Sequence, residues 1–450
     1  MPRMADIPAD LAQALLQDGD ARLEPVATGG RNRYGCTVRP DPGLLQLASS
    51  TASTISEAGW QAALAMHQGW LAATAPVSLA DSIAQVHRQL RALVQCPDDV
   101  RLSLTASGTD AHHLLVRAAC ADQPLCLIVP ETAETGSGVA SALAGPGVAR
   151  MRQYRLRDAE GQPLGAESMA LEIEPWLVEA VRDGLRVLLI QTDVSKTGLM
   201  APHRSLVEDW RARFGDALLL AVDACQLRMP PDRLAVRLQQ GEAVLLTGSK
   251  FMAGPSFSGA LLLPPGMGWQ DIAETELRPG LLLRWAAALR EMQDFTALPE
   301  QAVAHALARL GGKIAARLDE TACFRPYPVR LPDALPGETT RVWQKSPSLF
   351  VTGLRHAQGD LLDEAQVRNI YLRMQFPLAD APGGKQRVLV GQPVWCGSRG
   401  SQPALALRLA LSSRMLVDAV TVPGEQVRLE QQIVLALDKL AWLVDRIAQG

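Results

Sequence analysis

The sequence has 450 residues, of which 48% are hydrophobic, enough to bury a large core and to form at least two domains. Its 44 basic and 47 acidic residues leave a net charge of −3, so no basic field is available for nucleic acid or an anionic membrane surface. No apolar stretch approaches the roughly 20 residues that span a bilayer, and the N-terminal segment carries acids where a signal peptide is apolar. We therefore expect a cytoplasmic protein with a small-molecule substrate.

Two residue types are informative through their number and spacing. Seven cysteines are scattered without paired spacing, which predicts reduced thiols instead of a disulfide framework or a zinc site. The chain has only six lysines and far more arginines. A lysine in a polar loop flanked by glycine is therefore notable, because few others compete for a role that needs lysine.

The first two thirds of the chain predict an N-terminal arm followed by a large α/β domain. Residues 1–80 are expected to pack back on the body as the arm, and residues 81–295 to form the large domain. Within that domain, short apolar runs alternate with helix-like amphipathic stretches; the runs lie at 125–129, 186–191, 217–222, 243–247 and 259–264. Strands buried on both faces and separated by helices indicate a mostly parallel central sheet flanked by helices.

Residues 296–450 are predicted to form a smaller C-terminal α+β domain. Apolar periodicity changes here between helical and extended patterns. The expected elements are helices at 301–320, at 363–376 and from Glu425, with strands at 348–354, 387–394 and 404–411.

Candidate functional residues follow the predicted strands of the large domain. Ligands of an open parallel sheet bind beyond the carboxyl ends of its strands. Asp223 follows one apolar run, and a carboxylate buried there requires a cationic or protonated partner. Lys250 follows the next run, and a loop with the hydroxyl of Ser195 follows 186–191. An acid, a lysine and hydroxyl groups are therefore expected at one edge of the sheet.

A fourth strand end leads into a predicted helix through Ser107, Gly108 and Thr109. The free amides at such a helix start bind an anion, most simply a phosphate. An acid, a lysine and a phosphate cup suit a pyridine-ring cofactor that also carries an aldehyde. Asp223 would keep the ring nitrogen protonated, and Lys250 would form an imine and then act as a base of lowered pKa.

The segments AVDACQ and LLTGSKFMAGPSFSGALLL resemble the aspartate and lysine signatures of fold type I enzymes that depend on pyridoxal 5′-phosphate (PLP). More specifically, they are similar to those of the class V aminotransferase and cysteine desulfurase group, and the separation of 27 positions from Asp223 to Lys250 also matches. The resemblance spans residues 80–447. It implies PLP as the cofactor, an amino acid as the substrate, and a homodimer, because relatives build each site at the subunit interface.

The resemblance also implies individual roles. Lys250 would hold PLP as a Schiff base, Gln226 and Ser195 would contact the ring oxygen, and Thr109 and Ser249 would contact the phosphate. The segment ALRLALSSRM resembles the strand whose arginine binds the substrate carboxylate in relatives. By this likeness the carboxylate would be bound by Arg408, with Arg414 as the fallback.

Two segments depart from the family pattern. Where relatives stack an aromatic residue or histidine on the cofactor, this chain has PETAETGSG, so Glu131, Glu134 or Thr135 would cover the ring. The neighbouring-subunit loop of relatives is replaced by RPGLLLRW at 278–285. These departures favour a specialised enzyme, for example of secondary metabolism, that works through an external aldimine and a quinonoid. Transamination, elimination, replacement and condensation all stay open.

Several alternatives accompany this interpretation. Lys196 is the nearby rival of Lys250 as the Schiff-base residue. Cys396, in a glycine-rich segment expected to be an exposed loop, would serve a cysteine desulfurase or C–S lyase. His112 and His113 are interpreted as capping or packing residues instead of metal ligands. The stretch TGGRNRYG at 28–35 would bind a substrate anion or form a surface turn.

An alternative of another class is a regulator that binds PLP without catalysis. Such proteins usually join this fold to a basic DNA-binding module. Residues 1–80 have too few basic helices to supply one.

Overall fold

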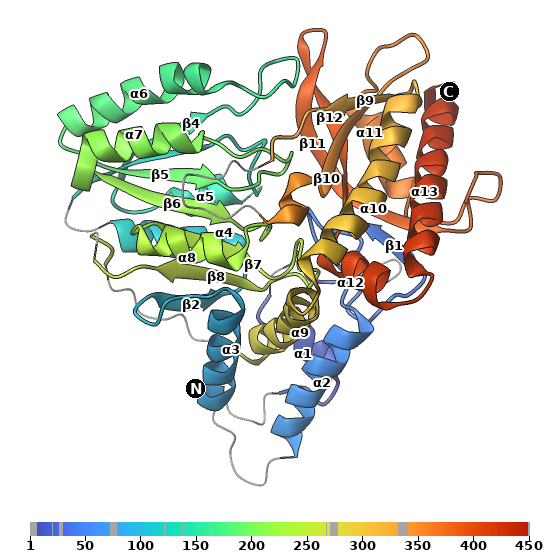
Figure 1. The fold of residues 1–450 in the computed structure, drawn as a ribbon, viewed down its shortest axis with the longest axis horizontal. Helices are drawn as coiled ribbons and strands as arrows, with labels where there is room; N and C mark the ends of the chain where they lie inside the picture. Colours follow the sequence, from blue (N-terminus) through green and yellow to red (C-terminus); the bar gives the residue numbers. More distant parts are fainter. Residues whose placement is uncertain are drawn as a thin grey trace.

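The chain forms two sheets that lie side by side, each with its own helices (Figure 1). The computed structural model describes residues 7–19, 21–26, 30–72, 79–120, 123–136, 138–266, 268–270, 278–331 and 341–448. The strands of the larger sheet lie on the left of Figure 1, and the orange strands of the smaller sheet lie on the right.

The larger sheet has seven strands in the order β2-β8-β7-β6-β5-β3-β4. Its strands are β2 (Arg101–Thr105), β3 (Leu125–Pro130), β4 (Val148–Tyr154), β5 (Arg186–Thr192), β6 (Leu218–Ala224), β7 (Ala243–Thr247) and β8 (Gly259–Leu263). All pairs are parallel except those of β8, which is antiparallel to both of its neighbours. The five apolar runs are thus confirmed as strands, and the mostly parallel sheet is confirmed with them.

Helices cover both faces of this sheet. They are α3 (Leu79–Leu93), α4 (Gly108–Ala119), α5 (Val139–Leu143), α6 (Ala166–Arg182), α7 (Arg204–Phe214), the short η2 (Gly215–Ala217), α8 (Pro231–Gln239) and α9 (Pro279–Thr296). On β3, Leu125, Leu127 and Val129 pack in the cluster that includes α4 and α5, while Cys126 and Ile128 pack in the cluster of α6 and α7. Because alternate residues of a strand face opposite sides, burial of both sets explains why these strands read as continuous apolar runs.

The smaller sheet has five strands in the order β1-β11-β12-β10-β9. Its elements are β1 (Leu44–Leu47), α10 (Glu300–Glu320), β9 (Phe324–Tyr327), η3 (Val342–Lys345), β10 (Leu349–Leu354), α11 (Glu364–Arg373), β11 (Arg387–Arg399), β12 (Gln402–Ala410), α12 (Ser413–Thr421) and α13 (Glu425–Ala448). The α+β character predicted for the C-terminal region is therefore confirmed. Within the described ranges, no helix is both long and apolar enough to cross a bilayer.

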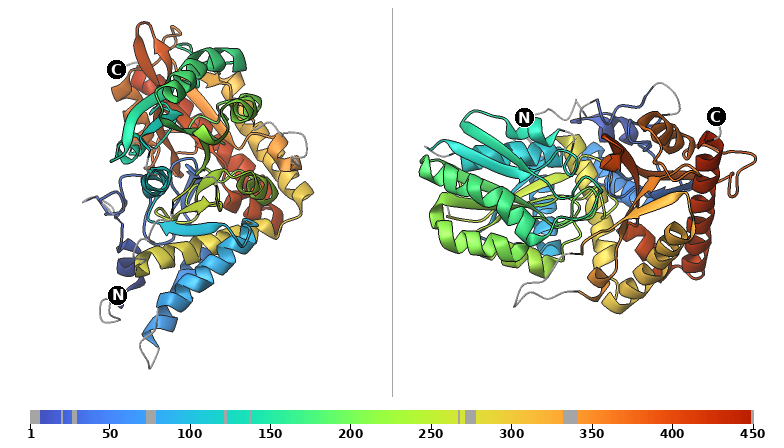
Figure 2. Two further views of the ribbon diagram at one scale, coloured as in Figure 1. Left: turned by 90° about the vertical axis from the view of Figure 1, so that its left-hand side faces the viewer. Right: turned by 90° about the horizontal axis from the view of Figure 1, so that it is seen from above.

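The N-terminal segment joins both halves. Strand β1 pairs in parallel with β11, and helices α1 (Leu11–Leu16) and α2 (Glu57–Leu71) pack on α9. Arg284 of α9 donates to the carbonyl oxygens of Leu15, at 2.7 Å, and of Gln17, at 2.6 Å. The view from above in Figure 2 shows the blue segment between the two halves. The unusual stretch at 278–285 therefore binds the chain's own N-terminal segment. Thr28 and Gly29 of the TGGRNRYG stretch lie outside the described residues.

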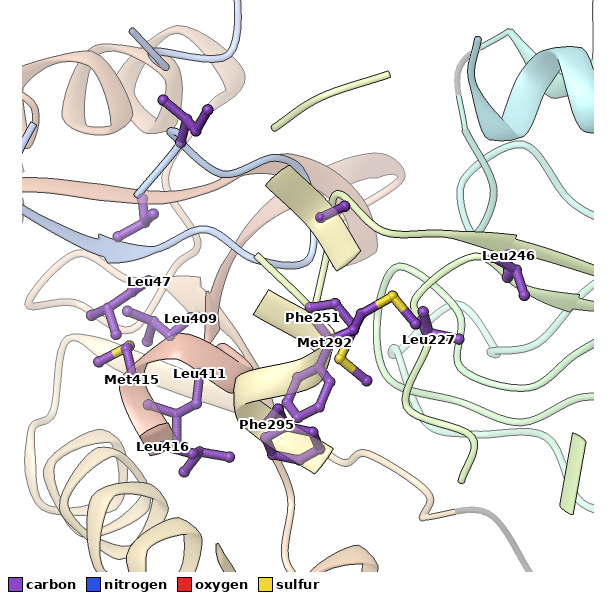
Figure 3. Packing of buried hydrophobic residues seen from close by; sticks show 14 of the residues in the cluster. Leu47, Leu227, Leu246, Phe251, Met292, Phe295, Leu409, Leu411, Met415 and Leu416 are labelled. Atoms are coloured by element: carbon purple, nitrogen blue, oxygen red, sulfur yellow. The ribbon is translucent and has the colours of Figure 1, made fainter. Parts of the chain in front are cut away.

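A continuous apolar cluster connects the two sheets, and Phe251 lies within it (Figure 3). The Phe251 ring is fully buried and lies 5.4 Å from the ring of Phe295 and 5.8 Å from that of Trp343. Burial of a phenylalanine side chain contributes about 2 kcal/mol. Since Phe251 directly follows Lys250, this packing fixes the backbone beside the candidate lysine at the junction of the two sheets.

Candidate active site

The structure brings the predicted site residues to one edge of the larger sheet. Asp223 lies near the end of β6, and Lys250 is the third residue after the end of β7. Strands β5, β6 and β7 are parallel neighbours, so their carboxyl ends share this edge. Strand β2 is antiparallel to β8, which is antiparallel to β7, so β2 also ends here before Ser107.

The Asp223 carboxylate is buried beside the ring of His112, on the helix that follows the cup. His112 Nε2 lies 3.4 Å from Asp223 Oδ2, and His112 Nδ1 lies 2.6 Å from the carbonyl oxygen of Gly108. Both partners accept hydrogen bonds, so an imidazolium with a proton on each nitrogen satisfies both of them. Burial alone would raise the pKa of Asp223, but the His112 hydrogen bond and the charges of His112 and Lys250 hold it well below its usual range.

His112 thus supplies the cationic partner that a buried Asp223 requires. Interpreting His112 as a mere capping or packing residue missed this contact, because the two residues are far apart in the sequence. A possible signal was its position one helical turn after Gly108, combined with the need of Asp223 for a partner. In the described part of the chain, no cluster of His, Cys, Asp and Glu could hold a metal ion.

A tight turn presents Lys250. Its backbone carbonyl accepts from Ala253 N at 2.9 Å, and Ala253 itself has a left-handed φ of +58°. A Cβ at Gly254 would lie 2.5 Å from Ala288 Cβ, so only glycine fits against α9 there. Ser249 is buried and the Lys250 side chain is half-buried. The Lys250 amine lies within electrostatic reach of Asp223.

The predicted phosphate cup is the first turn of α4. Ser107 caps this helix, since its Oγ accepts from Asp110 N at 3.3 Å and donates to Asp110 Oδ2 at 2.7 Å. The amides of Gly108 and Thr109 lie in the first turn, where no intrahelical acceptor exists. A Cβ at Gly108 would lie 2.9 Å from Cys225 Sγ, so glycine lets the helix start sit directly over the end of β6.

Gln226, two residues after β6, takes part in a series of buried hydrogen bonds. Its Nε2 donates to the carbonyl oxygen of Ser50 at 3.1 Å, and its Oε1 accepts from Arg228 at 2.6 Å. Arg228 in turn donates to Ser348 Oγ at 2.8 Å and lies over the ring of Phe251. These bonds fix the orientation of the Gln226 side-chain amide. They also link the two halves of the molecule, because Ser348 belongs to the smaller one.

Glu134 fastens the loop that follows β5. Its carboxylate accepts from Ser195 Oγ at 2.7 Å, from Thr197 Oγ1 at 2.6 Å and from Thr197 N at 3.2 Å. Arg157 adds a buried ion pair at 3.5 Å. The carboxylate of Glu131, another candidate, accepts from the backbone amide of Leu156, two residues after β4, at 3.2 Å. The Glu134 carboxylate therefore orders the Ser195 loop, and coverage of a cofactor ring by Glu134 stays a prediction.

Arg408 and Arg414 differ in their partners. Arg408 is buried and donates to the carbonyl oxygen of Gln392 at 2.8 Å and to Thr51 Oγ1 at 2.7 Å, which are neutral acceptors. Within the described residues it forms no ion pair with an acid. Arg414, the fallback, is neutralised by Glu291 at 2.7 Å. Arg408 is thus the one of the two whose charge is left for an anionic ligand.

Cys396 corrects one expectation, because it does not lie in an exposed loop. It lies in β11, buried against Tyr327, Val351 and Ala406. The glycines and proline around it are accommodated by register shifts between β11 and β12 instead of ending the strand. Burial raises the pKa of the Cys396 thiol to about 12, so the reactive thiolate is disfavoured.

Comparison with models of known protein families finds no match, and neither does comparison with curated protein sequences. Solved structures do match in fold. A NifS-like protein from Rickettsia africae is 12% identical with a TM-score of 0.56, over 88% of this chain and 99% of that chain. The cystine C-S lyase C-DES is 15% identical with a TM-score of 0.57, over 86% and 97%. The cysteine desulfurase CsdA from Escherichia coli is 14% identical with a TM-score of 0.55, over 88% and 95%. The chain therefore has the architecture of fold type I PLP-dependent enzymes, as its motifs predicted.

Proposed function

We propose that this chain is a PLP-dependent enzyme that acts on an amino acid, with Lys250 as the residue that forms the Schiff base. The observation that carries the proposal is the Asp223 carboxylate, kept charged by His112 and placed within electrostatic reach of the Lys250 amine. The fold supports it, because structural neighbours include C-DES with glycine covalently linked to its PLP cofactor.

The residues present fit PLP. Glycine at position 108 lets the start of α4 pack on Cys225 and Thr247 at the strand ends, and the first-turn amides with Ser107, Thr109 and Ser249 would hold the phosphate there. Asp223 would pair with the pyridine nitrogen. Gln226 is proposed to contact the ring oxygen. The predicted contact of Ser195 with that oxygen is not proposed, because its hydroxyl donates its one proton to Glu134; Ser195 and Glu134 would instead order the loop after β5.

When bound, PLP withdraws electrons from the bonds at the substrate α-carbon. Arg408 would pair with the substrate carboxylate and so orient the α-hydrogen. The Lys250 amine, once released by the substrate amine, would take the proton from the α-carbon as general base. Asp223 would hold a proton at the ring nitrogen, because its charge is retained at neutral pH.

The reaction after proton removal is proposed to be that of a specialised transferase or lyase, with transamination, elimination, replacement and condensation as candidates. A desulfurase that uses Cys396 as sulfur carrier is not favoured, because that thiol is buried. We also propose a cytoplasmic homodimer. Light scattering of the purified protein should give a mass near twice 48.4 kDa.

Absorbance spectroscopy tests the cofactor. Wild-type protein incubated with PLP and freed of excess should be yellow, and Lys250→Ala should lose this band. Lys345→Ala, at an exposed position, is the matched control and should keep it. A colourless wild type, or a Lys250→Ala variant with an unchanged band, would contradict the proposal.

A further inference from the structure

Lys196 is a second lysine presented at the candidate site by a rigid loop. Its backbone amide donates to the carbonyl oxygen of Glu134 at 3.1 Å, and the turn closes between Gly198 N and Ser195 O at 3.1 Å. The side chain is half-buried, and its amino group donates to the carbonyl oxygen of Thr132 at 3.3 Å. The position of the amine is therefore set by the same network that orders the loop.

Two other basic side chains, Lys250 and Arg408, lie within electrostatic reach of Lys196. Burial and the charges of Arg408 and Lys250 lower the pKa of Lys196 to about 7. Glu134 is the acid that opposes this shift, but its carboxylate already accepts from Ser195 and Thr197. No acid of the described ranges forms an ion pair with Lys196. The charges that act on Lys196 are thus mainly positive.

The proposed function accounts for two of these three charges. Lys250 would be bound to the cofactor and Arg408 to the substrate α-carboxylate, which leaves the Lys196 amine without an anion. A partly desolvated cation is stabilised by an opposite charge within hydrogen-bond distance. Building on the proposed function, we propose that Lys196 binds a second anionic group of the substrate, so that the preferred substrates are amino acids with an acidic side chain.

Binding of simple carboxylates tests this assignment without catalysis. PLP-loaded protein is titrated with succinate and glutarate and, as partners of equal chain length, with butyrate and valerate, by calorimetry and by the absorbance of the cofactor. Wild type should bind each dicarboxylate about tenfold more tightly than its partner. Lys196→Met should reduce this preference to about twofold, while Lys196→Arg should retain most of it. Lys313→Met, at an exposed position of α10, is the matched control and should behave as wild type.

Two results would overturn the proposal. One is equal affinity of wild type for the dicarboxylates and their monocarboxylate partners. The other is a Lys196→Met variant that keeps the dicarboxylate preference but releases PLP, because Lys196 would then serve the cofactor. Calorimetry on cofactor-free protein separates this proposal from that of PLP binding. Arg408 and Lys196 are both present without PLP, so the preference for glutarate and its loss in Lys196→Met should persist there.

Discussion

Replacing His112 by leucine removes the cation that pairs with the buried Asp223 carboxylate. The side chains of both residues are almost inaccessible to solvent, so water cannot take the place of the imidazolium. Breaking a buried ion pair from one side costs about 3–5 kcal/mol, because it leaves an uncompensated charge. We expect His112→Leu to lower the free energy of unfolding by about 3 kcal/mol at neutral pH, since leucine retains part of the apolar packing.

The pH dependence of this loss follows from the pKa of Asp223. In the wild type it lies below the unfolded value of 3.8, so the carboxylate stabilises the fold above that pH. Burial is already the largest influence on this pKa and raises it; without His112 it is opposed only by the Lys250 charge and the Cys225 amide, so we expect the pKa to rise above the unfolded value. The folded variant then binds a proton that the unfolded chain lacks. The part of the stability difference that comes from Asp223 should therefore shrink as the pH falls.

Urea unfolding of the cofactor-free proteins measures this difference at about pH 7.5 and about pH 5. His113→Leu is the matched control, because the neighbouring His113 is exposed and should lose little at either pH. His112→Leu should also bind PLP more weakly. Equal stability of the two histidine variants at about pH 7.5 would refute the pairing of His112 with Asp223.

Three further predictions concern other positions. Lys439 is fully buried and donates to three backbone carbonyl oxygens, so Lys439→Met should lower the free energy of unfolding in urea by about 3 kcal/mol; an unchanged midpoint would count against it. Cys396 should react with iodoacetamide at about pH 8 only after unfolding, and rapid labelling of the folded protein would contradict its burial. Arg408→Gln should weaken binding of alanine to the PLP-loaded protein about a hundredfold. Arg414→Gln should chiefly lower the free energy of unfolding, because it leaves the Glu291 carboxylate without its partner. Loss of alanine binding in Arg414→Gln but not in Arg408→Gln would assign the carboxylate to Arg414 instead.

The strands of the larger sheet were predictable where both faces are buried. Continuous apolar runs mark β3 and β5–β8, because each of these strands lies between helices. The edge strand β4 was not expected, since its residues are largely half-exposed and include arginines. Strand β1 has only four residues in a turn-rich segment and is stabilised by pairing with a strand more than 300 residues later. Such long-range pairing leaves no local signal.

In the candidate site too, features that depend on local sequence were predictable, whereas contacts between distant segments were not. Asp223, Lys250 and the cup were placed by strand ends and by motif spacing, which are local features. The contact of His112 with Asp223 joins α4 to β6. It could not be predicted from the hydrophobic periodicity of either element. For Cys396, glycine and proline indicated a loop, whereas pairing with β12 keeps the strand intact through bulges.

Trapping the cofactor on its lysine tests directly whether Lys250 forms the Schiff base. PLP-loaded protein is reduced with borohydride, which converts the imine to a stable amine, and its peptides are mapped by mass spectrometry. The modified residue is expected to be Lys250. Modification at Lys196 in its place, or the absence of a modified peptide in protein saturated with PLP, would contradict this expectation.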